Sequence, residues 1–164
     1  MKGIRFAENM SVIPLLPPAD ITSTNTWTAY VDLNLANWCT FLVSYGSVSS
    51  GGATCDDMLV QVVCSSLQTT ASVDAIDFQY RLSSAIATDS WGTITAGTSD
   101  GATIGPAVDS TNLLIDVDPS VVAAYSAVKR FVALEFTPIS TSTFVAVTAF
   151  LEHKYPGNTI PSSS

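Results

Sequence analysis

Residues 38–45 read WCTFLVSY, and this stretch decides the fold. Apolar side chains occupy every second position, namely Cys39, Phe41, Val43 and Tyr45. Thr40 and Ser44 lie between them. Successive side chains of a β-strand point to opposite faces, so an alternation with a period of two is typical of a strand with one buried face. The stretch therefore predicts a β-strand that lines a hydrophobic core.

Runs of the same kind recur along the chain. They predict further strands at residues 28–33, 58–65, 75–82, 91–96, 113–117, 131–137 and 144–151. The last run is apolar on both faces apart from Thr148, which predicts a central strand or one covered on both sides. One short helix is expected, because Asp118 suits an N-cap and Pro119 suits the first helical position before a run to Tyr125.

About eight short strands and at most one short helix predict an all-β protein, a jelly-roll-like antiparallel β-sandwich or barrel. An immunoglobulin-like sandwich is the alternative, although the chain lacks its Cys–Trp–Cys spacing. We expect an extended N-terminal arm at residues 1–27, the β domain at 28–155 and a flexible C-terminal tail at 156–164. The arm cannot be helical or mid-sheet, because its prolines lack a backbone N–H.

Composition excludes several classes of protein. The 164 residues carry a net charge of -8, only 12% are charged, and 21 are serine and 19 threonine. At 47% hydrophobic the chain is not disordered. Arg81 is the only basic residue between Arg5 and Lys129, so nucleic acid is not an expected partner. There is neither a signal-peptide core nor a stretch of about 18 apolar residues, so we expect a soluble protein made in the cytosol, without a membrane partner.

A search for chemistry yields little. The three cysteines include no CxxC pair, so we expect reduced core thiols at Cys39 and Cys64 and no zinc. The only histidine, His153, lies between two charged residues and offers no obvious triad. Asp116 and Asp118 share a strand face and suit either part of a calcium site or a solvent-facing residue and a helix cap. We predict no catalytic residue, no cofactor and no metal, and therefore no enzyme.

Three features suggest contacts with other proteins. The arm holds a short apolar run that cannot bury its leucines alone and must lie on its own sandwich or on a neighbouring subunit. That run comprises Ile13, Pro14, Leu15, Leu16, Pro17 and Pro18. Trp91 lies in a predicted loop and suits either partner contact or local packing. The loop at residues 98–105 is a further candidate for reaching a partner.

The pattern as a whole resembles the small decoration proteins, also called cement or head-stabilisation proteins, of tailed bacteriophage capsids. The resemblance rests on strand and turn patterns at residues 13–21, 29–33, 37–43, 78–81, 88–92, 114–118, 131–134 and 145–147. It implies a jelly-roll-like β-barrel or sandwich that assembles as a homo-oligomer, with a trimer favoured over a dimer. It also implies that the protein is assembled onto the outer capsid surface of the virion in the host cytoplasm. On that surface the protein would bridge subunits of the major capsid protein.

A second hypothesis comes from a different class. A carbohydrate- or receptor-binding jelly-roll module of a virion fibre or adhesin would share the same fold and composition. It would need exposed, coplanar aromatic rings or a calcium-dependent cleft.

Overall fold

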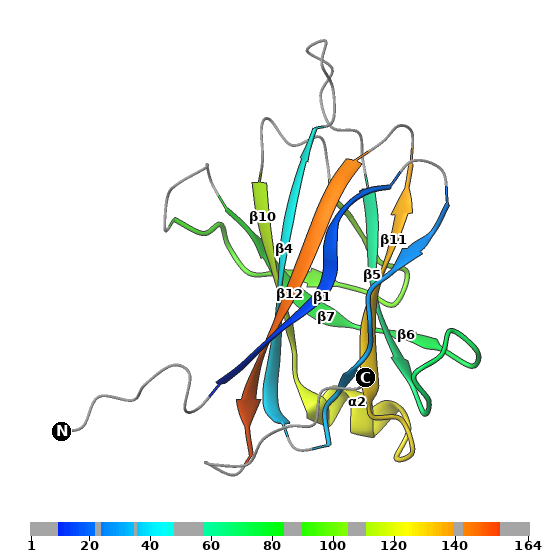
Figure 1. Cartoon of the computed structure of the whole chain (residues 1–164). Coiled ribbons are helices and arrows are strands. Elements are labelled where there is room, and N and C mark those ends of the chain that lie inside the picture. The colour runs from blue at the N-terminus through cyan, green and yellow to red at the C-terminus, as the bar shows by residue number, and fades with distance from the viewer. Residues whose placement is uncertain are drawn as a thin grey trace, which may run out of the picture.

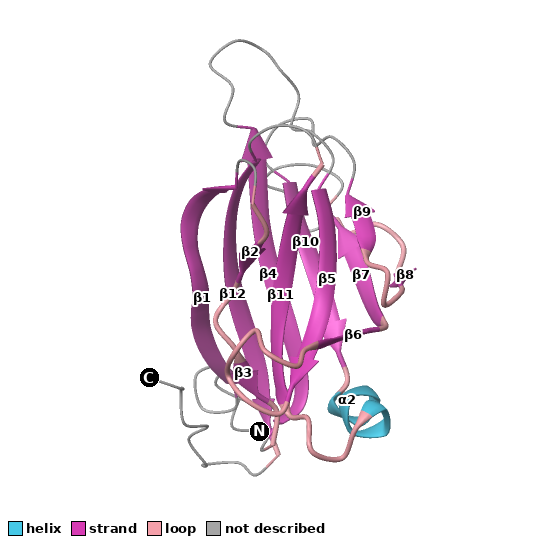
Figure 2. Cartoon of the chain, turned by 90° about the vertical axis from the view of Figure 1, so that its right-hand side faces the viewer, coloured by secondary structure: helices cyan, strands magenta, loops and turns pink. Residues whose placement is uncertain are grey.

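The computed structural model describes residues 10–21, 24–34, 36–47, 58–83, 90–104, 111–139 and 143–154. Within these residues the chain forms two antiparallel sheets of six strands each, packed face to face as a sandwich (Figures 1 and 2). The predicted all-β class is thereby confirmed. Residues 1–9 of the predicted arm, the glycine-rich stretch 46–52 beyond Ser47, and the predicted tail at 156–164 lie outside the described residues.

The first sheet contains the two ends of the described chain. In spatial order its strands are β1 (Met10–Ile21), β12 (Thr143–His153), β4 (Ala36–Ser47), β10 (Thr111–Val117), β7 (Phe78–Leu82) and β8 (Thr95–Gly97). The second sheet follows the order β2 (Thr26–Trp27), β11 (Phe131–Pro138), β5 (Met58–Ser65) and β6 (Asp74–Ile76), while β3 (Val31–Asp32) pairs with β11 and β9 (Ala102–Ile104) pairs with β5.

The predicted helix is confirmed as α2 (Pro119–Tyr125), the one helix in the described residues. Asp118 caps it, because its side chain accepts a hydrogen bond from the backbone N–H of Ser120 at 2.8 Å. Pro119 opens the helix, where its missing N–H leaves no donor unpaired. In the part of the chain that the structure describes, no helix is both long and apolar enough to cross a membrane.

The long alternating runs form strands as predicted. The runs at 38–45, 58–65, 113–117, 131–137 and 144–151 lie within β4, β5, β10, β11 and β12. β12 is a central strand, with β1 on one side and β4 on the other, as its apolar composition predicted. Its inward residues Val145, Val147, Ala149 and Leu151 are fully buried.

Three predicted strands need correction. The run at 75–82 is divided at Asp77 between β6 and β7, which belong to different sheets. Within the run at 28–33 only β3 is a strand, and β2 ends just before the run. The Thr28 hydroxyl accepts the backbone N–H of Leu134 at 3.0 Å, so a side-chain bond takes the place of a ladder bond there. The run at 91–96 shrinks to β8, and Trp91 makes only an isolated bridge with Ser83. The three-residue strand β9 was not predicted.

The N-terminal segment is extended, as expected, but residues 10–21 are a strand of the sandwich rather than a separate arm. β1 is an edge strand that pairs with β12 and carries two register shifts, between Pro14 and Leu16 and between Leu16 and Ala19. Prolines are tolerated at edges and bulges because no ladder bond is lost there. Leu15 is buried in the core, and Ile13 and Leu16 pack against it.

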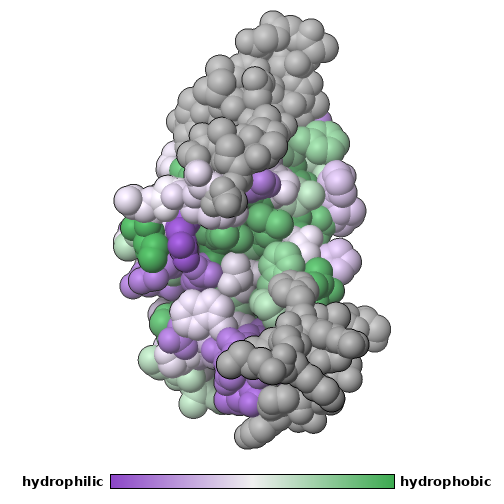
Figure 3. Space-filling view, turned by 90° about the vertical axis from the view of Figure 1, so that its left-hand side faces the viewer, coloured by the Kyte–Doolittle hydropathy of each residue, from purple (hydrophilic) through white to green (hydrophobic). Residues whose placement is uncertain are grey.

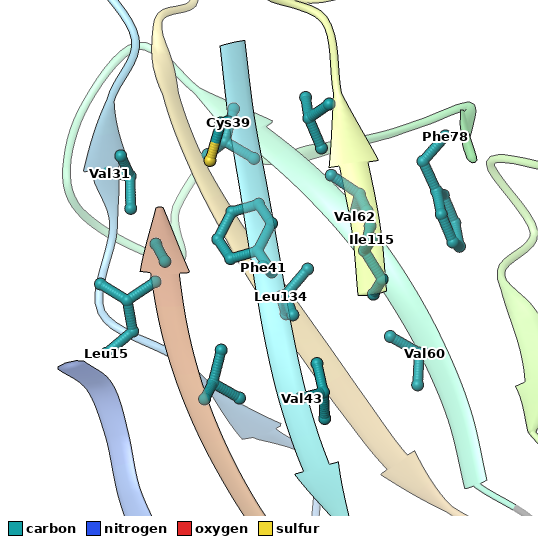
Figure 4. Close-up of a cluster of buried hydrophobic side chains, with 14 of the residues drawn as sticks. Leu15, Val31, Cys39, Phe41, Val43, Val60, Val62, Phe78, Ile115 and Leu134 are labelled. Carbon is teal, nitrogen blue, oxygen red and sulfur yellow. The ribbon is translucent and has the colours of Figure 1, made fainter. Parts of the chain in front are cut away.

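One continuous core fills the space between the sheets. Phe41 and Val43 from the first sheet face Val62 and Leu134 from the second (Figure 4). These four side chains expose none of their surface. Burial of a side chain of this size contributes about 1.5–3 kcal/mol, so the interior between the two sheets is what stabilises the fold.

If β1 belongs to the sandwich, shortening its buried side chain must destabilise the whole domain. We expect Leu15→Ala to lower the free energy of unfolding by about 2–5 kcal/mol through lost burial and a cavity. Val12→Ala, on the outer side of the same strand, is the matched control and should cost below about 1 kcal/mol. Urea unfolding followed by tryptophan fluorescence measures both. Equal, small losses for the two variants would mean that β1 is not part of the cooperative unit.

Candidate functional site

The outer face of the first sheet, which points away from the core, is unusually apolar along β12. Phe144, Ala146, Thr148 and Phe150 alternate with the buried residues of this strand and are partly or largely exposed. Phe144 exposes 41% of its surface. A strand whose second face met only solvent would carry polar side chains there. The composition of β12 therefore predicts that something outside the described chain covers this face.

The strand register extends this surface across the sheet. Val12 lies opposite Phe150, and Phe150 lies opposite Thr40. In the next row Pro14, Thr148, Leu42 and Leu114 follow one another from β1 to β10. We call this surface the apolar band, and its members are Val12, Pro14, Leu42, Leu114, Phe144, Ala146 and Phe150.

Figure 3 looks onto this outer face and shows hydrophobic side chains gathered across its middle, with hydrophilic ones to one side and below. Val12 is half exposed, and the remaining band members apart from Phe144 and Pro14 are intermediate in exposure. A contiguous apolar patch bordered by polar groups is typical of a surface that binds another protein. The apolar band is therefore the first part of the candidate site.

The second part is a hollow beside the band. It has a volume of about 490 Å³ and is lined by Trp38, Asp77, Phe78, Gln79, Ala96, Gly97, Thr98, Asp116, Asp118 and Val121. These residues come from β4, β7, β8, β10 and α2 and from the turns beside them. We call it the Trp38 hollow. It adjoins the band because Asp116 pairs with Thr40, which in turn pairs with Phe150.

Hydrogen bonds fix the side chains of the hollow. Asp116 Oδ1 accepts the Thr40 hydroxyl at 2.7 Å and the Trp38 indole N–H at 3.4 Å. Arg81 Nη2 lies 3.8 Å from Asp116 Oδ2, a partly exposed pair that contributes little to stability. Trp38 is 39% exposed, so its ring is oriented by Asp116 and still open to a ligand. Asp77 is held in turn by the backbone N–H of Ser99 at 2.8 Å.

Asp116 and Asp118 were expected either to form part of a calcium site or to act as a solvent-facing residue and a helix cap. Asp118 is the helix cap, and Asp116 is bonded to side chains of the outer face. Within the described residues, no group of three or more histidine, cysteine, aspartate or glutamate side chains is arranged to hold a metal ion. The arrangement therefore favours the cap and surface roles over calcium.

The predicted arm contacts are only partly on the surface. Leu15 is buried in its own sandwich, and Ile13 and Leu16 are half-buried against the core. Pro14, Pro17 and Pro18 are exposed along the β1 edge. Trp91 is half-buried beside Ser83, a position that is compatible with local packing and leaves part of its surface exposed. The loop at 98–104 is largely exposed apart from Ala102 and Ile104, and Gly105 lies outside the described residues.

The sequence analysis did not single out Trp38 or Val12 as surface residues. Trp38 lies near the start of β4 and is exposed on the outer face. The usable signal was parity: Trp38 and Val12 carry large apolar groups on the face opposite the core residues. Alternation alone classifies such positions as solvent-facing and gives no reason to assign them a binding role.

The hydroxyl of a serine contacts the imidazole of the histidine at one end of the first sheet. Ser11 Oγ lies 3.0 Å from His153 Nε2, where β1 meets β12. A catalytic pair also needs an acid on the other ring nitrogen. In the described residues His153 Nδ1 is buried and has no hydrogen-bond partner. This pair therefore lacks the group that would orient it and stabilise an imidazolium.

The described cysteines are core residues. Cys39 and Cys64 are both fully buried and free. Burial raises the pKa of Cys39 well above its usual range, and the carboxylate of Asp116 raises it further. Burial also raises the pKa of Cys64, although the ammonium of Lys129 acts in the opposite direction. Neither thiol is suited to nucleophilic chemistry, which requires a thiolate. Cys55 lies outside the described residues.

Comparison with known proteins identifies no relative of this chain. The chain matches no protein-family model, no curated protein and no solved structure. The fold and the site therefore carry the functional argument.

A buried neutral thiol makes stability depend on pH in a definite direction. The Cys39 thiol stays protonated in the folded state, whereas an unfolded cysteine ionises above about pH 8.5. Stability is therefore lost as pH rises beyond that value, by about 1.4 kcal/mol per pH unit for one thiol. Urea unfolding of Cys39→Ala between pH 8 and 10.5 should show a shallower fall than the wild type.

Val43→Ala is the matched control, because Val43 is an equally buried residue of the same strand without a proton to lose. Its stability should run parallel to that of the wild type over the whole pH range. A Cys39→Ala curve that is also parallel to the wild type would contradict the buried, neutral thiol.

Proposed function

We propose that this chain is a non-enzymatic structural protein of the virion, a decoration protein that binds the outside of the major capsid lattice of a tailed bacteriophage and stabilises it. The observation that carries the proposal is the apolar band. An apolar sheet face on a chain with a net charge of -8 is better suited to a protein surface than to nucleic acid. The capsid setting comes from the resemblance of the strand and turn pattern.

The fold supports this role in a physical sense. The band lies on paired strands whose backbone is fixed by the ladder, so little conformational entropy is lost when it binds. The outer face also carries few long charged side chains that would need to be ordered. A capsid lattice offers many identical sites, so a homo-oligomer that binds several of them at once has a higher overall affinity than a single chain.

Carbohydrate binding is less well supported as the main function. It was expected to show coplanar exposed aromatic rings, and the described tryptophans do not form such a platform. Trp38 lies on the first sheet, Trp27 is half-buried in the second, and Trp91 is half-buried beside β7.

The capsid proposal is tested with particles assembled without this chain. Recombinant wild-type protein, mixed with such particles, should pellet with them and be visible outside the shell by electron microscopy. Val12→Asp and Phe144→Asp should each reduce the pelleted fraction at least about tenfold, because a charge must lose its water to enter an apolar contact. Val128→Asp, a substitution of an exposed valine after α2, is the control and should bind like the wild type. Band variants that bind like the wild type would contradict the proposed surface.

The oligomeric state is measured separately. Size-exclusion chromatography with light scattering should give three times the chain mass of 17.2 kDa. A monomer that persists at high protein concentration would overturn the expected homo-oligomer.

A further inference from the structure

We propose that the Trp38 hollow binds a basic side chain, an arginine or lysine, of the protein on which the apolar band docks. The inference deepens the proposed function, and it rests on that function only for the identity of the partner. It draws on three observations: the open indole, the charge of the hollow and the continuity between hollow and band.

The indole of Trp38 provides a fixed aromatic face. Its N–H is held by Asp116, and the ring stays exposed at the wall of a hollow. A cation over a tryptophan ring is attracted by the negative face of the π-system, and tryptophan is the strongest of the aromatic side chains in this respect. A ring that is already oriented loses little entropy when a cation settles on it.

The negative charge of the hollow favours a positively charged ligand. Three carboxylates line it, those of Asp77, Asp116 and Asp118, against the single guanidinium of Arg81 beside Asp116. Lys129 and Arg130 pair with Asp74 and Asp32, away from the lining residues. An anionic ligand would be repelled here, whereas a guanidinium or ammonium group is complementary in charge.

The lining carboxylates also retain acceptor capacity. In the described residues, Asp77 and Asp118 each accept a backbone N–H through Oδ1, and no bond is made to the second oxygen of either group. A basic side chain that lies on the indole can donate to these oxygens at the same time. The exposed amide of Gln79 and hydroxyl of Thr98 border the same space.

Continuity with the apolar band favours a protein side chain over a free sugar. The hollow and the band share the outer face and meet where Thr40 lies between Asp116 and Phe150. A partner that covers the band therefore also covers the hollow. An apolar contact with a complementary charge at its rim gives both binding free energy and selectivity.

The first test uses short peptides and the full chain. Acetyl-Gly-Arg-Gly-amide is titrated against its citrulline counterpart, which has nearly the same shape without the charge, and against maltotriose as a neutral sugar. The Trp38 indole N–H is followed by nuclear magnetic resonance at low ionic strength. The arginine peptide should bind at least about fivefold more tightly than the citrulline peptide, and salt should weaken it. Equal binding of both peptides, binding of maltotriose alone, or no shift at all would overturn the proposal.

Variants then locate the contact. Trp38→Ala should weaken binding of the arginine peptide at least about fivefold, and Trp38→Phe less. The double variant Asp77→Asn, Asp118→Asn keeps both backbone hydrogen bonds, since an amide oxygen also accepts, and should weaken binding by a similar factor. Asp20→Asn, an exposed carboxylate on β1, is the matched control and should change nothing. Unchanged melting temperatures confirm that each variant is folded.

The pelleting assay separates the two proposals. If the wild type pellets with particles and the variants Trp38→Ala and Asp77→Asn, Asp118→Asn pellet equally well, the capsid role is supported and the contact with a basic side chain is contradicted. If the wild type does not pellet but the arginine peptide binds as expected, the hollow stands and the capsid role falls.

Discussion

The pairing of β12 with β1 on one side and β4 on the other is the constraint on which the rest of the structure depends. This register sends Val145 and Ala149 into the core and leaves Phe144 and Phe150 outside. A slip by one residue would exchange the two sets, because the side-chain period of a strand is two. The core tolerates only one choice: Ala149 lies opposite Phe41, where a second phenylalanine would have no room in a close-packed interior. The outward phenylalanines are thus fixed by the same packing that excludes them from the core.

Alternation predicted the long strands well and failed wherever the chain changes sheets or leaves the ladder. The run through Asp77 keeps its parity because both sheets face the same interior, so Ile76 and Phe78 are buried although they belong to different sheets. A sequence pattern records which side is buried, not which strand lies alongside. β1 was not predicted as a strand for another reason. Its prolines argue against a regular ladder of hydrogen bonds, and two register shifts accommodate them.

The candidate site was less predictable than the fold. The apolar run of the arm was expected to lie on its own sandwich or on a neighbouring subunit. Leu15 is buried in its own sandwich, whereas Val12 and Pro14 lie on the outer face. Parity cannot be extrapolated through a bulge, so the faces of the residues that follow the first register shift, from Leu16 onward, could not be assigned from the sequence. The Trp38 hollow could not be predicted for a topological reason, since its walls come from α2 and from four strands of the first sheet that are far apart in the sequence.

The band and the hollow complement each other physically. An apolar surface contributes binding free energy but discriminates poorly, because many apolar surfaces fit it about equally well. Carboxylates gain little in open water, since solvent screens them, but their interactions strengthen when a partner excludes that water. The hollow therefore binds a basic group weakly in isolation, and its selectivity increases as a partner covers the band. A partner without a basic group at that position would have to bury the carboxylates of Asp77 and Asp118 without a counter-charge, which would weaken the whole contact.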